Sequence, residues 1–180
     1  MIFKAADMEL HTPRLNLRPI SVSDAPALFA ARSDPDVMRF WDWPVQKSVA
    51  EVEDVFRLYA PAPRDESMLW WAVALSPHGP AIGECDLNTI DHQHRRAEVG
   101  YLFARAHWSK GYAAEATQAV IATAFGALKL ERLTARVHSG NEKSVRLLER
   151  LGFRYEGTLR AYFLRDGERR DCLLYGLTKS

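Results

Sequence analysis

A short loop around Lys110 and Gly111 separates an apolar strand pattern from an apolar helix pattern. Before the loop, Val99, Tyr101 and Phe103 alternate with their neighbours, as in a β-strand. From about Gly111 onward, apolar side chains recur at the i, i+3, i+4 spacing of a helix face. The first turn of such a helix presents unpaired backbone N–H groups and the positive end of the helix dipole. We therefore expect this loop to bind a phosphate group.

The glycine and alanine of this loop also favour an anion site. Gly111 lets an anion approach the main chain closely, and Ala113 does so almost as well. Two well-known phosphate-binding patterns are absent, because the chain contains neither G-x-x-x-x-G-K-[ST] nor G-x-G-x-x-G. A strand-to-helix turn that binds no ligand is the alternative interpretation.

Two segments resemble the signatures of one enzyme superfamily. Residues 108–113, W-S-K-G-Y-A, resemble the acyl-CoA loop [QR]-x-x-G-x-[GA] of the GCN5-related N-acetyltransferases, abbreviated GNAT. Trp108 departs from the first position, but W-x-K-G-Y-A-x-E-A is typical of the RimJ/RimL-type N-terminal acetyltransferases of ribosomal proteins. Residues 138–153 resemble the second signature, N-x-x-[AS]-x-x-L-x-x-x-L-G-F, with Asn141 and Ser144 in place. The two signatures occur in the family's order, so the resemblance covers nearly the whole chain.

The resemblance implies that acetyl-CoA binds between two central strands that splay apart. Its pantetheine arm would pair with strand backbone and reach Asn141, and its pyrophosphate would contact loop N–H groups. The residues expected to bind the cofactor are Tyr101, Leu102, Phe103, Trp108, Ser109, Lys110, Gly111, Tyr112, Ala113, Ala114, Asn141 and Ser144.

One position departs from the wider family. Many GNAT members carry a tyrosine seven residues after the signature asparagine, where it protonates the departing thiolate, but Leu148 stands there in this chain. The RimJ/RimL branch also lacks this tyrosine and has a serine three residues after the asparagine. The resemblance thus makes Ser144 the candidate that hydrogen-bonds the sulfur. The alternative is that Ser144 only contacts backbone in the first turn of its helix.

Transfer of an acyl group to an amine needs a group that takes a proton from the nitrogen. Glu98 lies on the predicted strand before the cofactor loop, where desolvation would raise the pKa of a carboxylate. We predict that Glu98 is this general base and contacts the substrate. An ion pair with Arg95 or Arg96, or another structural pairing, is the alternative.

Three large aromatic residues lie close together in a loop-like stretch, namely Phe40, Trp41 and Trp43. They either cap the core beneath a helix pair or form an aromatic wall for an acceptor peptide or amine. Trp41 and Trp43 are therefore candidate substrate-binding residues.

No metal site is expected from the histidines and cysteines. His92 and His94 have no third ligand at a suitable spacing, so we interpret them as a solvated turn. His107 is interpreted as loop packing. Cys85 and Cys172 form no C-x-x-C pair and lie in apolar runs, where we expect small buried side chains.

The pattern of elements predicts a mixed α/β (α+β) fold of GNAT type. The expected strands span residues 9–20, 69–75, 81–90, 97–103, 133–137, 153–164 and 170–178; the expected helices span 23–33, 48–59, about 111–128 and 142–151. This order implies six or seven strands flanked by about four helices, with a right-handed crossover between a parallel central pair.

Length and composition fit one globular domain over residues 1–180. The chain has 180 residues, of which 47% are hydrophobic and 26% charged. A net charge of +1 gives no support for nucleic-acid binding. The sequence shows no signal peptide and no apolar run of membrane-spanning length. We expect a cytoplasmic monomer or homodimer without nucleic-acid or membrane partners.

We predict an N-acetyltransferase in which a primary amine attacks the thioester of acetyl-CoA directly. By the resemblance, the acceptor is a protein or peptide N-terminal α-amine. A small amine such as an antibiotic, amino acid or polyamine is one alternative. A non-catalytic acyl-CoA sensor is another.

Overall fold

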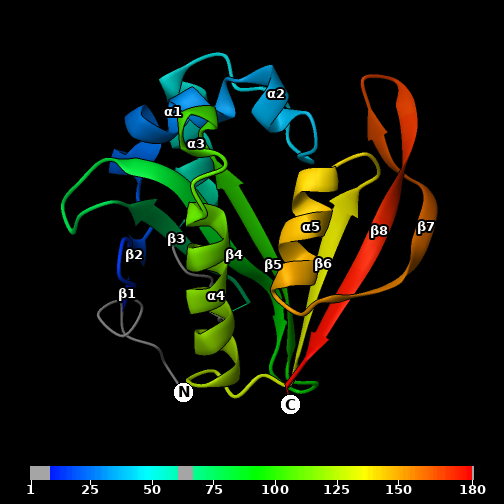
Figure 1. Ribbon diagram of the computed structural model, residues 1–180. Coiled ribbons are helices and arrows are strands. Elements are labelled where there is room, and N and C mark those ends of the chain that lie inside the picture. Colours follow the sequence, from blue (N-terminus) through cyan, green and yellow to red (C-terminus); the bar gives the residue numbers. More distant parts are fainter. Residues whose placement is uncertain (1–8, 61–66, 180) are drawn as a thin grey trace.

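One mixed sheet of eight strands crosses the molecule, and helices cover both of its faces (Figure 1). The structure is a computed structural model that describes residues 9–60 and 67–179. The strands lie in the order β1-β2-β3-β4-β5-β6-β8-β7. They are β1 Leu10–His11, β2 Asn16–Pro19, β3 Leu69–Ala74, β4 Ala81–Asp91, β5 Arg96–Phe103, β6 Arg132–His138, β7 Arg154–Arg165 and β8 Glu168–Thr178.

In the described parts of the chain, five α-helices and two 3-10 turns connect these strands. The α-helices are α1 Ala25–Arg32, α2 Pro35–Met38, α3 Val49–Tyr59, α4 Tyr112–Phe125 and α5 Glu142–Arg150; the 3-10 turns are η2 Val22–Asp24 and η3 Arg105–His107. Within the described residues, no helix combines the length and the hydropathy needed to cross a membrane.

The predicted mixed α/β architecture is confirmed, with local differences near the N-terminus. The predicted strand 9–20 is two antiparallel strands, because the chain turns where the Thr12 N–H donates to the Leu15 carbonyl at 2.9 Å. The sheet therefore has eight strands instead of six or seven. The unpredicted helix α2 begins after Asp34, whose side chain accepts the Asp36 N–H at its N-terminus. The sequence Pro61-Ala62-Pro63, which we expect to end the helix predicted over residues 48–59, lies outside the described residues.

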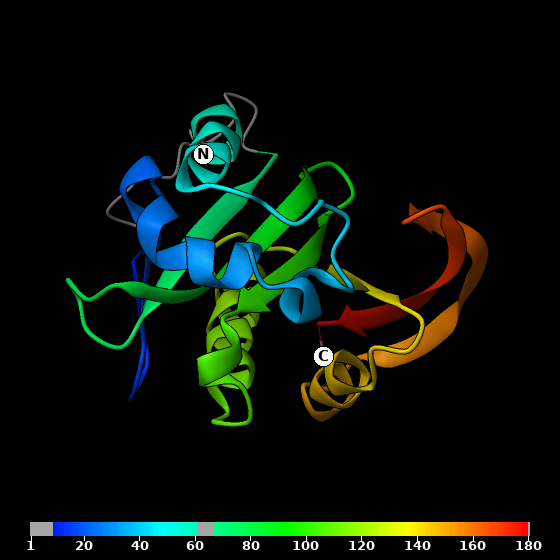
Figure 2. The same cartoon turned by 90° about the horizontal axis from the view of Figure 1, so that it is seen from above.

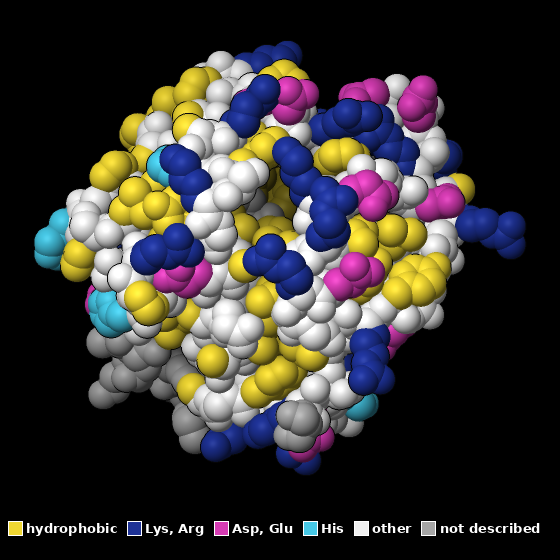
Figure 3. Space-filling model, in the orientation of Figure 1, with side chains coloured by type: hydrophobic (Ala, Val, Ile, Leu, Met, Phe, Trp, Pro, Cys, Tyr) yellow, Lys and Arg dark blue, Asp and Glu magenta, His cyan; other side chains and the backbone are white. Residues whose placement is uncertain are grey.

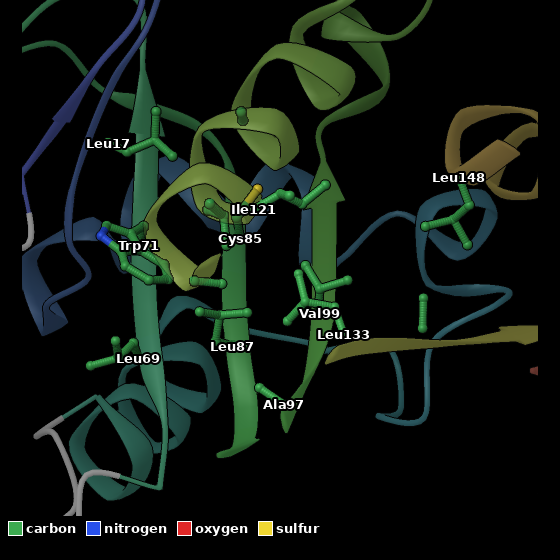
Figure 4. Packing of buried hydrophobic residues seen from close by; sticks show 14 of the residues in the cluster. Leu17, Leu69, Trp71, Cys85, Leu87, Ala97, Val99, Ile121, Leu133 and Leu148 are labelled. Atoms are coloured by element: carbon green, nitrogen blue, oxygen red, sulfur yellow. The ribbon is translucent and has the colours of Figure 1, made fainter. Parts of the chain in front are cut away.

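Alternate residues of β3 belong to two hydrophobic clusters on opposite faces of the sheet. Leu69, Trp71 and Val73 belong to the larger cluster, which contains the buried side of α4 (Figure 4). Trp70 and Ala72 belong to a second cluster with residues from α1 and α3. Because successive strand side chains point to opposite faces, α4 covers one face and α1 and α3 cover the other (Figure 2).

Helix α4 is held mainly by its apolar side. Val120, Ile121 and Ala124 are buried against the sheet, as their spacing predicted. An isolated helix of this length is marginal in water, so this burial is what stabilises α4 and its N-terminal end.

The parallel strands β5 and β6 pair over only a short stretch. Their register runs from Arg96 opposite Arg132 to Glu98 opposite Thr134 and then ends. Beyond it, β5 stays bonded to β4 and β6 stays bonded to β8, and the two strands diverge (Figure 1). The predicted splay is confirmed, and it opens a wedge in the middle of the sheet.

Candidate active site

The wedge forms the centre of a cleft of about 1400 Å³. Its walls come from the ends of β5 and β6, the loop after β5, the N-terminal turns of α4 and α5, and residues 39–43. Figure 3 shows apolar side chains inside this hollow and Lys and Arg side chains around its mouth. Arg105, Lys143 and Arg146 are among the lining residues. Such a cleft suits a ligand that has phosphates at one end and an uncharged arm.

The loop after β5 leaves backbone amides exposed at the start of α4. Gly111 caps α4 with φ +82°, a left-handed conformation that favours glycine, and Ser109 has φ +60°. The Trp108 indole N–H donates to the Phe103 carbonyl at 2.7 Å and closes the loop onto the strand. The first N–H groups of a helix have no intrahelical acceptor, so those of α4 can receive an anion.

An arginine that the sequence analysis missed holds this loop from the N-terminal hairpin. Arg14 donates from Nε to Glu115 at 2.6 Å and from Nη1 to the Lys110 carbonyl at 3.0 Å. The Thr12 hydroxyl also donates to Glu115 at 2.6 Å. Glu115 lies in the first turn of α4, where the helix dipole favours a carboxylate. Its place in the W-x-K-G-Y-A-x-E-A string is the only local signal of this contact.

All predicted cofactor-binding residues except Lys110 line the cleft. They are Tyr101, Leu102, Phe103, Trp108, Ser109, Gly111, Tyr112, Ala113, Ala114, Asn141 and Ser144. The side chain of Lys110 is exposed outside it. Lys143 of α5 lies over the Trp108 ring, with Nζ 4.4 Å from the centroid. The two signature segments, remote in sequence, therefore meet at one cleft.

The hydroxyl groups of Tyr101 and Ser144 are hydrogen-bonded at 2.5 Å across the wedge. The Ser144 hydroxyl therefore does not contact backbone alone, which was the alternative considered from the sequence. Asn141 caps α5 as predicted, since its side-chain oxygen accepts the Ser144 N–H at 3.3 Å. Burial raises the pKa of Tyr101 well above its ordinary value, so the phenol stays neutral. Leu148 is fully buried, whereas Tyr101 of β5 lines the cleft.

Glu98 points to the opposite face of β5 from Tyr101, because the two residues are an odd number of positions apart. Both of its carboxylate oxygens accept from Nε of Arg136 at 2.8 Å. The pairing with Arg95 or Arg96 is wrong, because those side chains bond other carboxylates. The other half of that alternative, a different structural pairing, is confirmed by the ion pair with Arg136. Burial raises the pKa of Glu98 and Arg136 opposes it, with a net shift upward.

Residues 39–43, called the bridge segment below, cross one end of the cleft. Arg165 of β7 donates to the backbone carbonyls of Trp41 at 2.9 Å and Trp43 at 2.6 Å. Trp41 packs on a small buried cluster, whereas Trp43 is 38% exposed and meets Tyr59 edge-on at 5.3 Å. Both indoles line the cleft. Trp41 therefore covers a buried cluster and also lines the cleft, so it has one feature of each interpretation.

Asp42 joins the bridge segment to β6. Its Oδ1 is hydrogen-bonded to Nε2 of His138 at 2.8 Å, and its Oδ2 lies 3.8 Å from the Arg136 guanidinium. His138 is buried and stacks on Phe163 with ring centroids 3.6 Å apart. The segment is therefore fixed to the far side of the wedge by side chains as well as by Arg165.

Two buried carboxylates on β4 were not recognised from the sequence. Glu84 is fully buried and pairs with Arg32 of α1 at 2.6 Å. Asp86 is buried, lines the cleft and accepts the Asn88 side-chain amide at 2.7 Å. Burial raises the pKa of Asp86 to about 7. In the sequence, Glu84, Asp86 and Asn88 alternate with the apolar residues Cys85 and Leu87. This pattern indicates a strand with one polar face.

The remaining histidines and cysteines behave mostly as expected. Cys85 and Cys172 are buried free thiols. His94 is exposed and bonds Asp91 at 2.8 Å. His107 lines the cleft, and burial lowers its pKa. Across residues 9–60 and 67–179, no group of three His, Cys, Asp or Glu side chains is placed to hold a metal ion.

Known proteins resemble this chain over most of its length. A family model described as an acetyltransferase (GNAT) domain matches residues 14–154. The chain is 34% identical over 170 residues to the uncharacterized N-acetyltransferase YoaA of Bacillus subtilis (strain 168), covering 94% of this chain and 96% of YoaA. It is 29% identical over 159 residues to the spermidine N(1)-acetyltransferase of Escherichia coli (strain K12), covering 88% and 83%.

A solved structure shares the fold. Mycobacterium smegmatis RimJ in complex with CoA-disulfide matches with a TM-score of 0.83 and 27% identity, over 94% of this chain and 85% of that one. The similarity to the RimJ-like branch, predicted from two short signatures, is confirmed. The chain therefore belongs to the GNAT acetyltransferase family and is an acetyl-CoA-dependent N-acetyltransferase.

Proposed function

We propose that this enzyme acetylates the N-terminal α-amine of a protein or peptide. The observation that carries the proposal is the open cleft, which joins an amide-lined loop to a second end walled by Trp41, Trp43 and Glu98. Small-molecule sites usually occupy roughly 300–1,000 Å³, and this cleft of about 1400 Å³ leaves room for an extended chain beside the cofactor. A relative of Bacillus subtilis (strain 168) named as the putative ribosomal N-acetyltransferase YdaF is consistent with this acceptor class.

The proposed acetyl-CoA site consists mainly of backbone groups. N–H groups from Ser109 to Ala114, with Trp108 and Lys110 at the loop, would hold the pyrophosphate. The edge of β5 that faces β6 has no ladder partner at Tyr101, Leu102 and Phe103 among the described residues. That edge can bond the pantetheine amides as an added strand would, with Asn141 beside it.

In the chemical step, Glu98 takes a proton from the attacking nitrogen, and backbone N–H groups of the splayed strand polarise the thioester carbonyl. The Ser144 hydroxyl, oriented by Tyr101, hydrogen-bonds the sulfur as the C–S bond breaks. Holding both reactants in one cleft supplies much of the acceleration.

A small cationic amine is the second candidate. Asp42, Asp86 and Glu98 line the cleft near the bridge segment, and carboxylates at these positions could attract a cationic amine. The E. coli relative named as a spermidine acetyltransferase is consistent with such an acceptor.

The test is a panel of acceptors incubated with acetyl-CoA, with released thiol and product mass as readouts. The panel contains peptides that begin with Ser, Ala or Met, the same peptides with blocked N-termini, spermidine, spermine and free amino acids. We expect thiol release with free peptides and none with blocked ones. Turnover of spermidine alone would replace the peptide proposal by the polyamine one.

Two variants separate an enzyme from an acyl-CoA sensor. Glu98→Gln and Ser144→Ala should keep acetyl-CoA affinity near that of the parent and lower turnover. Acetyl-CoA binding without thiol release by any panel member would favour the sensor. The cytoplasmic location and the monomeric or homodimeric state stay predictions.

A further inference from the structure

Among the described residues, Asp86 differs from the other buried carboxylates, Asp24 and Glu84, because it lacks a cationic partner. Glu98 is paired with Arg136, and Glu84 with Arg32. Within the described residues, no Lys, Arg or His side chain forms an ion pair with Asp86, and its hydrogen-bond donor is the neutral amide of Asn88. A buried carboxylate without a cation is costly, so such a group is relieved by a proton or by a positively charged ligand.

The strand register places this buried carboxylate at the wall of the wedge. Asp86 lies opposite Gly100 of β5, and both residues line the cleft. A Cβ at position 100 would collide with Oδ1 of Asp86, so only glycine leaves room for the carboxylate over β5. Glu98 and Gly100 are two positions apart on β5, so they lie on the same face of the sheet. Asp86 and Glu98 therefore lie on the same side of the sheet, opposite the side of Tyr101.

This side is the one covered by α1 and α3, whereas the cofactor loop begins α4 on the other side. The charged or titratable groups that face Asp86 are Glu84 of its own strand, Arg32 of α1, Glu98 of β5 and, beyond Glu98, Arg136 of β6. Trp70, its neighbour on β3, is uncharged. An amine that enters from this side meets Asp86 next to the splayed strands.

The reaction itself requires two proton acceptors. At neutral pH an amine arrives as an ammonium ion, because α-amino groups have a pKa of about 8 and alkylamines about 10. It must lose one proton before attack and a second one before it becomes an amide. Glu98 can hold one of these protons at a time, so a second carboxylate beside the amine would speed the other transfer.

We propose that Asp86 accepts the first proton from the incoming ammonium group and that Glu98 accepts the second; this inference rests on the proposed function. The freed lone pair forms the C–N bond at the thioester carbonyl. The C–S bond then breaks, with its electron pair on the sulfur that Ser144 contacts. The two protonated carboxyl groups release their protons to the thiolate and to solvent. A pKa of about 7 suits a group that both takes and releases a proton at neutral pH.

The first test is Asp86→Asn, assayed with acetyl-CoA and a peptide that has a free N-terminal serine. We expect kcat/KM at pH 7 to fall about 100-fold, the usual scale of a proton-transfer contribution. At pH 9 the deficit should shrink at least about tenfold, because the α-amine is then mostly neutral without help. With spermidine as the probe, the deficit should persist at pH 9, since its amines are still protonated. A loss that is the same at every pH would overturn the proposal.

Asn88→Leu gives a second test, in which the direction of the shift in the pH profile is predicted. The Asn88 hydrogen bond lowers the pKa of Asp86, so its removal should move the acid limb of the pH profile to higher pH. The matched control is Asp91→Asn on the same strand, whose carboxylate pairs with His94 and Arg96 away from the cleft. It should leave the profile unchanged. An acid limb that does not move in Asn88→Leu would also overturn the proposal.

Different results would overturn the proposed function and the role of Asp86. If the parent enzyme acetylates no amine, the proposed function fails and this inference fails with it. If the parent acetylates the peptide and Asp86→Asn matches it at every pH, only this inference fails. Asp86→Asn should keep acetyl-CoA affinity near that of the parent, which checks that the variant is folded.

Discussion

Ser144 and Glu98, two of the side chains proposed to act in the chemical step, are each bonded to a neighbour from another element. Ser144 of α5 is bonded to Tyr101 of β5, and Glu98 of β5 is bonded to Arg136 of β6. A hydroxyl that already has one fixed partner loses less freedom when it bonds a further atom. The chemistry at the residue scale therefore depends on positioning residues as much as on the groups that touch the substrate.

Removing the Tyr101 hydroxyl should test this positioning. Tyr101→Phe keeps the ring and deletes the bond to Ser144, a change worth about 1 kcal/mol. We expect kcat to fall roughly fivefold to tenfold while KM for acetyl-CoA stays within about twofold. Tyr155→Phe is the control, because that hydroxyl bonds Thr158 on the exposed face of β7. Equal effects of both variants would contradict the role of Tyr101.

At the scale of elements, the alternation of β5 gives its two faces different surroundings. Its odd-numbered residues from Val99 to Phe103 face the cluster beneath α4 and the cofactor loop. Glu98, Gly100 and Leu102 face the side of α1 and α2. Because a strand has a period of two, the proposed sites need only one short segment, whose backbone would bind the cofactor and whose carboxylate would face the acceptor.

Adding one methyl group at Gly111, the residue that caps α4, should weaken acetyl-CoA binding. Gly111 has φ +82°, so Gly111→Ala costs roughly 1–2 kcal/mol of backbone strain or shifts the loop. We expect KM for acetyl-CoA to rise about fivefold or more with little change in kcat. Gly167→Ala is the matched control, since Gly167 has φ +80° in the β7–β8 turn and open space around it. It should lower thermal stability similarly and leave KM unchanged.

At the scale of the molecule, a splayed sheet needs contacts that hold its two halves at a fixed separation. The bridge segment provides them at the acceptor end through Arg165 and Asp42. The ion pair between Arg14 and Glu115 ties the N-terminal hairpin to the loop at the cofactor end. Both sets of contacts use arginine, whose several donors can bond two groups at once.

Breaking the bridge should loosen the acceptor end alone. Arg165→Leu removes the bonds to the carbonyls of Trp41 and Trp43. We expect KM for the peptide acceptor to rise several-fold and KM for acetyl-CoA to stay near its parent value. Arg160→Leu, on the exposed part of the same strand, should change neither. A matching rise in both Michaelis constants would show that the bridge supports the whole cleft.

The buried pair of Arg32 and Glu84 should matter to stability more than to binding. Both side chains are almost fully buried, so Arg32→Met leaves an uncompensated charge and costs roughly 3–5 kcal/mol. Burial raises the pKa of Glu84, so its folded form holds a proton more tightly than the unfolded one. The variant should therefore lose further stability as pH rises from 5 to 8. Urea unfolding measures this, and adding Glu84→Gln should restore most of the loss.

Local patterns determined the loop, the caps and the order of elements. Gly111, Asn141 and the apolar faces of α4 and α5 act within one turn of their own positions, so spacing alone predicts them. The same holds for the two family signatures, which are short and contiguous. For this reason the fold class and the family were predictable from the sequence, and every predicted site residue except Lys110 lines the cleft.

Only the tertiary structure decided which side chains meet across the cleft. The bond between Tyr101 and Ser144 spans 43 positions, that between Arg136 and Glu98 spans 38, and that between Arg14 and Glu115 spans 101. Such pairs depend on strand register and on the splay, which no local spacing encodes. The burial that gives Asp86 its raised pKa likewise comes from elements distant in sequence. Contacts of this kind exist only after the sheet has formed, because the folded chain alone excludes water from them.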